Sequence, residues 1–449
     1  MVKFSPPVLA LPHYGMVKLS PRISTLSRAI KDNGAMFKRS IEERVQEAVG
    51  HSRVVLINGP RQVGKTTLVR ELIDFGQEAT YVTFDDIVSL SFAQRDPAGF
   101  VGQFGGTTII DEIQRAPELF LPIKAAVDRS KKPGSFVLTG SANVFALPRL
   151  ADSLAGRMQI ITLWPLSQGE IDGVKENFID WVFREEVSLP RSLGGDRKEV
   201  IARAIRGGYP EALDRKTERL RRQWLDAYVT NLINRDVREI GNIRDLKDFP
   251  VLLNALAIKS GTLLNLSDIS RTVGIPHETL RRYMALLAAL WLVVELPAWP
   301  SNLGRRLLRT PKITMNDTGL LAGLLNLDQR RLSREPVYLG QLLESFAVME
   351  LRKQMGWNET QVGIFHFRDQ KGAEVDIVLE SASGEIVGIE VKSAATPRAE
   401  DFSGLRYLQS AVGERFRRGV LLHTGDKASS LSKVLHALPL SALWKRYPA

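Results

Sequence analysis

The chain has 449 residues, more than one hydrophobic core usually serves, so we expect two or three domains. Hydrophobic residues make up 44% and charged residues 25%, proportions that argue against wholesale disorder. The absence of cysteine excludes disulfides, thiolate zinc sites and a cysteine nucleophile. The six histidines have no HxH or HExxH spacing, so the sequence predicts no histidine-built metal site.

The formal net charge of +11 favours polyanionic partners, nucleic acid first and anionic membrane surfaces second. No segment has the ~18–20 uninterrupted apolar residues that a membrane span needs, so we expect no membrane contact and a cytoplasmic protein. Residues 1–35 are rich in proline and basic residues and lack a compact apolar core, which excludes a secretory signal. We expect a flexible N-terminal extension there, with an organelle-targeting leader as the alternative.

Between residues 37 and 163 the pattern predicts strands that alternate with helices. The apolar, β-branched run 53–58 is typical of a strand buried on both faces of a parallel sheet. Helices are expected over 37–49, from 65 to about 75 and over 117–129, and further strands over 81–84, 107–110, 136–139 and 158–163. This alternation predicts a doubly wound α/β domain over residues 36–170.

The segment 59–66, between the first of these strands and the next helix, fits the pattern GxxxxGK(S/T) in full. Its glycines permit backbone conformations closed to other residues, so successive N–H groups can surround the β-phosphate of ATP. The start of the helix adds partial positive charge. Lys65 would reach the β- and γ-phosphates, and the hydroxyl of Thr66 would bind Mg²⁺. The predicted nucleotide-binding residues are Gly59, Pro60, Arg61, Gln62, Val63, Gly64, Lys65, Thr66 and Thr67.

The strand 107–110 is followed by two carboxylates, Asp111 and Glu112. Asp111 would hold the magnesium ion together with Thr66, and Glu112 would polarise the water that attacks the γ-phosphate. Because both halves of the site occur in the order and spacing that the chemistry needs, the sequence predicts a magnesium-dependent ATPase. Lys65, Asp111 and Glu112 are its predicted catalytic residues.

Polar residues after the fourth and before the fifth strand add candidates for catalysis. Ser141 is expected to sense the γ-phosphate, with Asn143 as the second candidate. Arg157, with Arg149 as the alternative, is either an arginine finger that acts on a neighbouring subunit or an ordinary surface charge.

After Pro165 the character of the sequence changes. Residues 171–200 look like a polar, loop-rich insertion, and residues 201–257 are helical and basic, so 171–260 is expected to be an insertion and helical lid region. The run 266–296 predicts a helix, a turn at Gly274, a second helix and a strand, within a winged-helix domain over 261–335. His277, Arg281 and Arg282 would project from the second helix toward DNA; a purely structural winged helix is the alternative.

The last segment, 336–449, predicts a small α/β domain: an apolar helix from residue 340, then strands over 363–367, 374–379, 385–391 and 419–423. Glu390 and Lys392 are two residues apart on one strand and therefore face the same side. With Asp376 on the neighbouring strand and Glu344 on the helix, they form a candidate nuclease site, because carboxylates with a lysine can hold Mg²⁺ for phosphodiester cleavage. A non-cleaving binding module and a solvent-facing row of charges remain alternatives.

From about Phe37 to the end, the chain resembles the AAA-type ATPases of bacteria and archaea that carry a C-terminal restriction-endonuclease-like domain of the PD-(D/E)xK, Mrr-like class. The segments that carry the resemblance are GPRQVGKTT, DEIQ, LTGSAN, SLAGR, GGYPEAL, NDTGLL and the pair EVDIV and IEVK. The resemblance implies a DNA-directed ATPase that self-associates, for example as a hexameric ring. Residues 1–35 and 171–200 depart from the family pattern.

The leading hypothesis is an ATPase, with ATP and Mg²⁺ as cofactors, that binds and remodels DNA such as branched or recombination and repair intermediates. One alternative is an ATP-controlled, metal-dependent DNA endonuclease. Another is a nucleotide-dependent signalling or toxin-like switch without motor activity.

Overall fold

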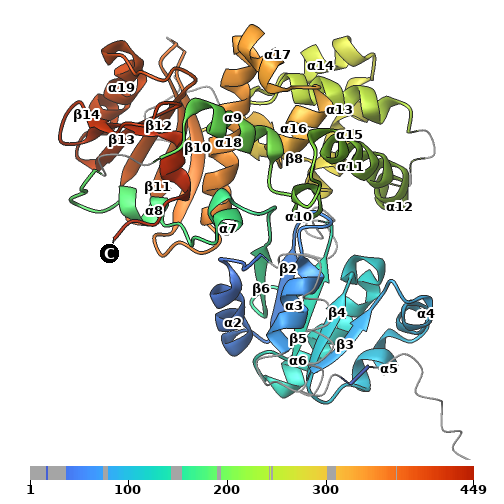
Figure 1. The fold of residues 1–449 in the computed structure, drawn as a ribbon. Helices are drawn as coiled ribbons and strands as arrows, with labels where there is room; N and C mark the ends of the chain where they lie inside the picture. The colour runs from blue at the N-terminus through green and yellow to red at the C-terminus, as the bar shows by residue number, and fades with distance from the viewer. Residues whose placement is uncertain are drawn as a thin grey trace, which may run out of the picture. The chain divides into compact units, whose positions relative to one another are not determined.

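The computed structural model describes residues 17–18, 37–73, 79–142, 154–189, 194–241, 243, 246–300, 310–370 and 372–448. The chain divides into two compact units, whose elements are labelled in Figure 1. Apart from β1, the first unit comprises the described residues of 45–58 and 65–161. The second comprises the described residues of 34–44, 59–64 and 162–449.

The first unit is built on a sheet with the strand order β1-β3-β4-β5-β2-β6. Neighbouring pairs among β3, β4, β5 and β2 are parallel, and β1 joins β3 in the antiparallel sense. Since parallel strands end at the same edge, the residues that follow β2, β4 and β5 lie along one edge of the sheet. The bounds are β1 Val17–Lys18, β2 Val54–Asn58, β3 Ala79–Thr83, β4 Thr107–Asp111, β5 Phe136–Gly140 and β6 Met158–Thr162.

The five strands expected for this domain, β2 to β6, are all present, and the parallel α/β arrangement is confirmed. Its core is formed where Leu56, Ile110 and Leu138 of the sheet pack with Phe120 and Ile123 of α6. The helices are α2 Glu42–His51, α3 Lys65–Ile73, α4 Ile87–Arg95, α5 Pro97–Gly102 and α6 Phe120–Ser130, with 3-10 turns at Ile113–Arg115 and Pro117–Leu119.

The first helix begins later than the expected residue 37. Ser40 donates its backbone N–H to Glu170, 2.8 Å away, and the side chain of Arg39 is ion-paired with the same carboxylate. These contacts hold residues 39 and 40 outside the helix. Apart from Val17–Lys18, the expected N-terminal extension lies outside the described residues.

The second unit opens with helices, and here the structure differs from the polar, loop-rich segment expected over 171–200. Phe178, Trp181 and Val182 of α8 are buried, and the Trp181 ring stacks on Tyr447 with centroids 4.2 Å apart. The charged residues on either side of the run NFIDWVF concealed its apolar character. The helices are α7 Gln168–Asp172, α8 Phe178–Val182, α9 Arg197–Arg206, α10 Pro210–Leu213, α11 Glu218–Asn231, the π-helical turn η5 Leu232–Val237, α12 Arg238–Gly241 and α13 Asp248–Ile258.

The middle of this unit pairs helices with a three-stranded antiparallel sheet of order β7-β9-β8. Asn265 caps α14 by accepting the N–H of Asp268, and Gly274, at φ +71°, ends it. A positive φ is easily adopted only by glycine, which explains the turn at this position. The elements are β7 Thr262–Leu263, α14 Leu266–Val273, α15 His277–Ala289, β8 Val293–Leu296, β9 Lys312–Met315, α16 Thr318–Leu324 and α17 Gln329–Arg334.

The C-terminal part forms a mixed sheet of order β10-β11-β12-β13-β15-β14, and both α18 and α19 pack on β12 (Figure 1). Leu405 and Leu408 of α19 join the core with Val375, Val378 and Leu421 of the sheet. The elements are α18 Pro336–Gln354, β10 Val362–Arg368, β11 Glu374–Ser381, β12 Ile386–Lys392, α19 Ser403–Val412, β13 Phe416–His423, β14 Ser429–Ser430 and β15 Leu435–Pro439. The part of the chain that the structure describes contains no helix long and apolar enough to cross a membrane.

Candidate functional site

The loop that carries the phosphate-binding motif joins the end of β2 to the start of α3. Gly59 has φ +140° and Gly64 has φ +94°, so both glycines adopt backbone conformations that other residues avoid. A Cβ atom at Gly59 would lie 2.1 Å from the backbone oxygen of Leu163, which leaves no room for any other residue. Gln62, at φ +61°, adopts the left-handed region without being glycine, a strain typical of functional loops.

Asp111 is the centre of a hydrogen-bonded cluster within the first unit. The hydroxyl of Thr66 lies 3.0 Å from Asp111 Oδ2, and the hydroxyl of Tyr81 donates to the same oxygen at 2.7 Å. The hydroxyl of Thr139, on β5, donates to Oδ1. Burial and the Asp111 charge raise the pKa of Tyr81 to about 12, which keeps it a donor at neutral pH. The carboxylate is therefore fixed beside Thr66, while the contacts that Tyr81 and Thr139 make with it were not foreseen.

Glu112 belongs to a second cluster next to the first. Its backbone has φ +61°, and its N–H donates to Thr139 Oγ1 at 3.2 Å. Its carboxylate accepts hydrogen bonds from Ser141, at 3.0 Å, and from Gln114. Gln114 also donates to Ser141 Oγ, 2.8 Å away. The structure thus brings Glu112 and Ser141 together and adds Gln114. Their roles as water-activating carboxylate and phosphate sensor stay predictions.

The cluster suits Mg²⁺ in its donor chemistry. Thr66 and Asp111 offer only oxygen atoms, which this ion prefers, and Thr66 is the last residue of the phosphate-binding motif. Within the described ranges no group of three His, Cys, Asp or Glu side chains is arranged to hold a metal ion. A magnesium ion at Asp111 would therefore take its other ligands from nucleotide phosphates and water, which is how P-loop proteins hold it.

The candidate arginine Arg157 is engaged inside its own unit. Its Nε lies 2.5 Å from Asp128 Oδ1, and Arg53 approaches the same carboxylate at 3.5 Å. Its role as an arginine finger stays a prediction. Asn143 and Arg149 lie outside the described residues.

Two arginines of the second unit, Arg39 and Arg61, fix the phosphate-binding loop, residues 59–64, to other residues of that unit. Arg61 is ion-paired with the buried Asp236 of η5, with Nε and Oδ2 2.5 Å apart. Arg39 donates to the backbone oxygen of Val63 at 2.7 Å and to that of Trp164 at 2.8 Å. Neither contact was predicted, because both depend on residues more than 20 positions away in the sequence.

The candidate nuclease residues form a chain of contacts in the C-terminal part. The register of β11 and β12 pairs Ile377 with Ile389, which sets Asp376 opposite Glu390. Asp376 Oδ2 accepts the N–H of Val391 at 2.9 Å, and Lys392 Nζ lies 3.4 Å from Glu390 Oε2. Burial, and then the charge of Asp376, raise the pKa of Glu390 well above its ordinary value.

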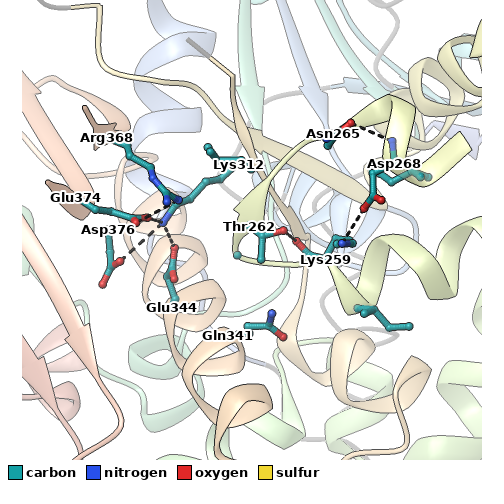
Figure 2. Close-up of a pocket in the computed structure, with 14 residues that line it drawn as sticks. Lys259, Thr262, Asn265, Asp268, Lys312, Gln341, Glu344, Arg368, Glu374 and Asp376 are labelled. Carbon is teal, nitrogen blue, oxygen red and sulfur yellow. Dashed lines mark hydrogen bonds and ion pairs between the residues drawn. The ribbon is translucent and has the colours of Figure 1, made fainter. Parts of the chain in front are cut away.

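Two further residues complete this site, as Figure 2 shows. Lys312 Nζ, from β9, lies 2.7 Å from Glu344 Oε1, 2.8 Å from Glu374 Oε1 and 3.8 Å from Asp376 Oδ1. Burial and then Asp376 raise the pKa of Glu344 to about 8, although Lys312 opposes this shift. Glu374 could have been found from its spacing of two residues before Asp376, which places both on one face of β11. Lys312 gives only a weak signal, a cation at the start of a short apolar strand.

The expected magnesium-binding arrangement of these carboxylates differs from the one observed, because an ammonium group lies among them. A cavity of about 770 Å³ adjoins the cluster (Figure 2). Its walls include Glu344 and Glu374 on one side and Lys259 and Asp268, which are ion-paired at 2.9 Å, on the other.

The predicted DNA-binding residues lie on α15. Arg281 and Arg282 are exposed, whereas His277 is half-buried at the start of the helix. On the preceding helix α14, Arg271 is also exposed and pairs loosely with Asp268, 3.7 Å away. On the opposite face of α15, the side chains of Leu280, Tyr283 and Leu287 are buried. The two arginines are thus free of the core and available to solvent.

Family models match three stretches of the chain. Residues 51–172 match an AAA domain. Residues 197–331 and 339–443 match two domains of unknown function, DUF8612 and DUF4143. The first match identifies the N-terminal part as a P-loop ATPase domain. The C-terminal match does not indicate a nuclease.

Relatives that match most of the chain were also found. The uncharacterized protein Rv2008c of Mycobacterium tuberculosis is 30% identical over 404 residues, which are 90% of this chain and 83% of that protein. The uncharacterized protein MJ1544 of Methanocaldococcus jannaschii is 21% identical over 382 residues, 80% of each chain. Among solved structures, the Walker-type ATPase PABY2304 of Pyrococcus abyssi is similar at 16% identity and a TM-score of 0.42, over 65% of this chain and 97% of that chain. The Hsp104–ADP complex of S. cerevisiae is similar at 14% identity and a TM-score of 0.29, over 76% of this chain and 47% of that chain.

Proposed function

Because the chain belongs to the family of the mycobacterial protein Rv2008c and carries an AAA domain, we propose that it is a magnesium-dependent ATPase that acts on DNA. The observation that carries the ATPase part is the cluster in which Thr66 lies 3.0 Å from Asp111 while Glu112 is held by Ser141 and Gln114. A purely structural strand end does not need two separately oriented carboxylates.

Each residue has a role that its position supports. The ammonium group of Lys65 would neutralise charge on the β- and γ-phosphates, and Thr66 with Asp111 would hold a magnesium ion, which would supply further neutralisation of the phosphates. Glu112 accepts a hydrogen bond from the attacking water and orients it in line with the γ-phosphate. Ser141 and Gln114 keep the Glu112 carboxylate in one rotamer, and Ser141 reports whether the γ-phosphate is present.

DNA is the proposed partner. The order α13, β7, α14, α15, β8, β9, with its three-stranded antiparallel sheet, supports a winged helix, and exposed Arg281 and Arg282 suit contacts with phosphates. The net charge of +11 points the same way. The mixed sheet with its cluster of carboxylates supports a restriction-endonuclease-like fold for the C-terminal part. The proposal includes a cytoplasmic location and self-association, for example as a ring in which Arg157 serves a neighbouring site.

The second candidate is a nucleotide-dependent switch that gates a protein partner. The observation that favours it is the contact between the phosphate-binding loop and η5 through Arg61 and Asp236, 2.5 Å apart, since η5 would respond to changes in the loop. A π-helical turn within a helix is a common mark of a functional position. An ATP-controlled endonuclease is the third candidate.

The test is steady-state ATP hydrolysis with magnesium, alone and with duplex, single-stranded and four-way-junction DNA. We expect Lys65→Ala to lose nucleotide binding, and Glu112→Gln to bind nucleotide but hydrolyse it at least ~10²-fold more slowly. Stimulation by one form of DNA supports the DNA-directed ATPase. A slow rate that is indifferent to every DNA favours the switch, and nucleotide binding retained by Lys65→Ala contradicts the site itself.

A further inference from the structure

The carboxylates of the C-terminal part already have a cation. Lys312 Nζ lies 2.7 Å from Glu344 and 2.8 Å from Glu374, and 3.8 Å from Asp376 (Figure 2). The Lys312 side chain is only 4% exposed, so its charge is compensated by these carboxylates and not by water. The nitrogen stands beside Glu344 and Asp376, two of the carboxylates from which a divalent metal at the predicted nuclease site would take its ligands.

The backbone fixes Lys312 at this place. Lys312 pairs with Leu263 on one side and with Leu296 on the other, so β9 is the central strand of its sheet. Just before β9, the backbone oxygen of Thr310 is bonded to the His366 ring on β10 at 2.9 Å. The side chain therefore enters the cluster from a strand that is held from both sides.

Lys312 and a metal ion exclude one another at this position. An ammonium nitrogen at 2.7–2.8 Å from two carboxylates occupies the space of a metal ion, whose oxygen ligands lie at about 2.0–2.6 Å. Arg368 brings a second positive charge, 3.4 Å from Glu374. No three His, Cys, Asp or Glu side chains in the described residues are arranged for a metal, so the residues present do not fit the ion that a nuclease of this class uses.

We infer that Lys312 replaces the divalent metal at this site: its ammonium group is a built-in cation that joins β9 to α18 and β11, and the C-terminal domain serves in binding rather than in metal-dependent cleavage. The inference concerns the second unit alone and stands whether or not the ATPase proposal is correct. It separates the DNA-binding and endonuclease hypotheses, because only the latter needs the carboxylates free.

The first experiment uses the wild-type full chain without nucleotide. Mn²⁺ binding is followed by electron paramagnetic resonance in the wild type and in Asp376→Asn. Equal binding in the two proteins supports the inference, since the carboxylates are then closed to metal. A bound Mn²⁺ ion in the wild type that Asp376→Asn loses would overturn it.

The second experiment removes the cation. Lys312→Met keeps most of the length of the side chain but leaves buried carboxylates without their partner, so we expect the melting temperature in EDTA to fall by roughly 5–15 °C. Mn²⁺ should restore a large part of this loss, because the vacated position now accepts a metal. The additional change Glu344→Gln should abolish the rescue.

Lys259→Met is the matched control. Lys259 is a lysine of the same cavity, ion-paired with Asp268 at 2.9 Å, but its removal frees none of the clustered carboxylates. We expect no Mn²⁺-dependent rise in its melting temperature. If Lys312→Met folds and gains no Mn²⁺ site, the inference is wrong, because the carboxylates then do not form a cation site at all.

Discussion

Tyr81 is the residue of the nucleotide site whose contribution is easiest to isolate. Its hydroxyl donates to Asp111 Oδ2 at 2.7 Å and is itself approached by Arg70 Nη2 at 3.3 Å. The Tyr81 ring also lies under the Arg70 guanidinium, 4.7 Å from its centroid, so the ring stays in place without the hydroxyl. A change to phenylalanine therefore removes the hydroxyl, with its hydrogen bonds to Asp111 and Arg70, and little else.

We expect Tyr81→Phe to lower kcat/KM for ATP by roughly 3–10-fold, because a hydrogen bond to a charged group contributes about 1.5–3 kcal/mol and only part of it orients Asp111. The measurement is hydrolysis as a function of magnesium concentration. Tyr407→Phe is the control, since it removes a hydroxyl that donates to Asp369 at 2.8 Å in the second unit. Equal activity of Tyr81→Phe and the wild type would mean that Thr66 and Thr139 suffice to orient Asp111.

Glu176 is a buried acid that the nucleotide chemistry does not use. Neither of its oxygens has a well-aligned hydrogen bond in the part of the chain that the structure describes, and a Cβ at Gly169 would lie 2.0 Å from Oε2. Burial, with the charges of Glu350 and Glu170, raises its pKa from 4.5 to about 8, an effect that Ser167 partly offsets. At neutral pH the folded chain therefore keeps a proton on Glu176 that the unfolded chain has lost.

This shift predicts how stability depends on pH. Between pH 4.5 and 8 the folded state binds more protons, so the contribution of Glu176 is complete below pH 4.5 and is lost as the pH rises through 8. Glu176→Gln removes the ionisable group. We expect its free energy of unfolding at pH 8.5 to exceed that of the wild type by about 1–3 kcal/mol. Urea titrations between pH 5 and 9 provide the measurement.

Glu186→Gln, an exposed change in the same segment, should stay within about 0.5 kcal/mol of the wild type at every pH. A Glu176→Gln protein that is destabilised equally at all pH values would show that the carboxylate has a partner in the folded chain.

Among the elements, α15 carries the DNA-binding part of the proposal. Its inner face packs in the core through Leu280, Tyr283 and Leu287, so its two exposed arginines can be replaced without loss of structure. The double change of Arg281 and Arg282 to alanine should weaken duplex binding, and the slope of log K against log salt should become shallower by about 1 for each DNA phosphate that is no longer neutralised. Fluorescence anisotropy at several salt concentrations measures both effects.

The control for α15 is Arg330→Ala, an exposed arginine of α17. It lowers the net charge but removes no side chain from α15, so we expect a smaller change in affinity. If all of these variants keep the wild-type salt slope, α15 does not bind DNA and the winged helix is a structural element.

The elements that could be predicted are those whose signal is local. β2 and β4 were found because each is a continuous apolar run followed by a motif, and α14 with α15 because Gly274 separates two amphipathic patterns. α8 and β15 were missed for different reasons. The five residues of α8 are flanked by charges, and β15 is a short run that contains His436 and ends in Pro439. The partners of a functional residue escape prediction when they come from another element, as Tyr81 does for Asp111 and Lys312 does for Glu344.

For the whole chain, the sequence predicts two or three domains, and the structure divides the chain into two compact units. The sequence predicts boundaries near residues 35, 170, 260 and 335 from changes in composition. These changes do not predict that residues 59–64 belong to the second unit and Lys65 onward to the first. Local patterns cannot give this result, because it depends on long-range interactions such as that between Arg39 and Val63.

Two compact units predict two transitions in calorimetry, because each has its own core and neither needs to unfold with the other. A non-hydrolysable ATP analogue with magnesium should raise the transition of the first unit, which contains Lys65, Thr66 and Asp111. At a ligand concentration 100 times Kd, binding adds about 2.7 kcal/mol to the free energy of unfolding, or several degrees for a unit of this size. Lys65→Ala should show the same two transitions and no shift. A single transition would contradict the independence of the two units. A nucleotide-induced shift that Lys65→Ala retains would contradict the position of the nucleotide site.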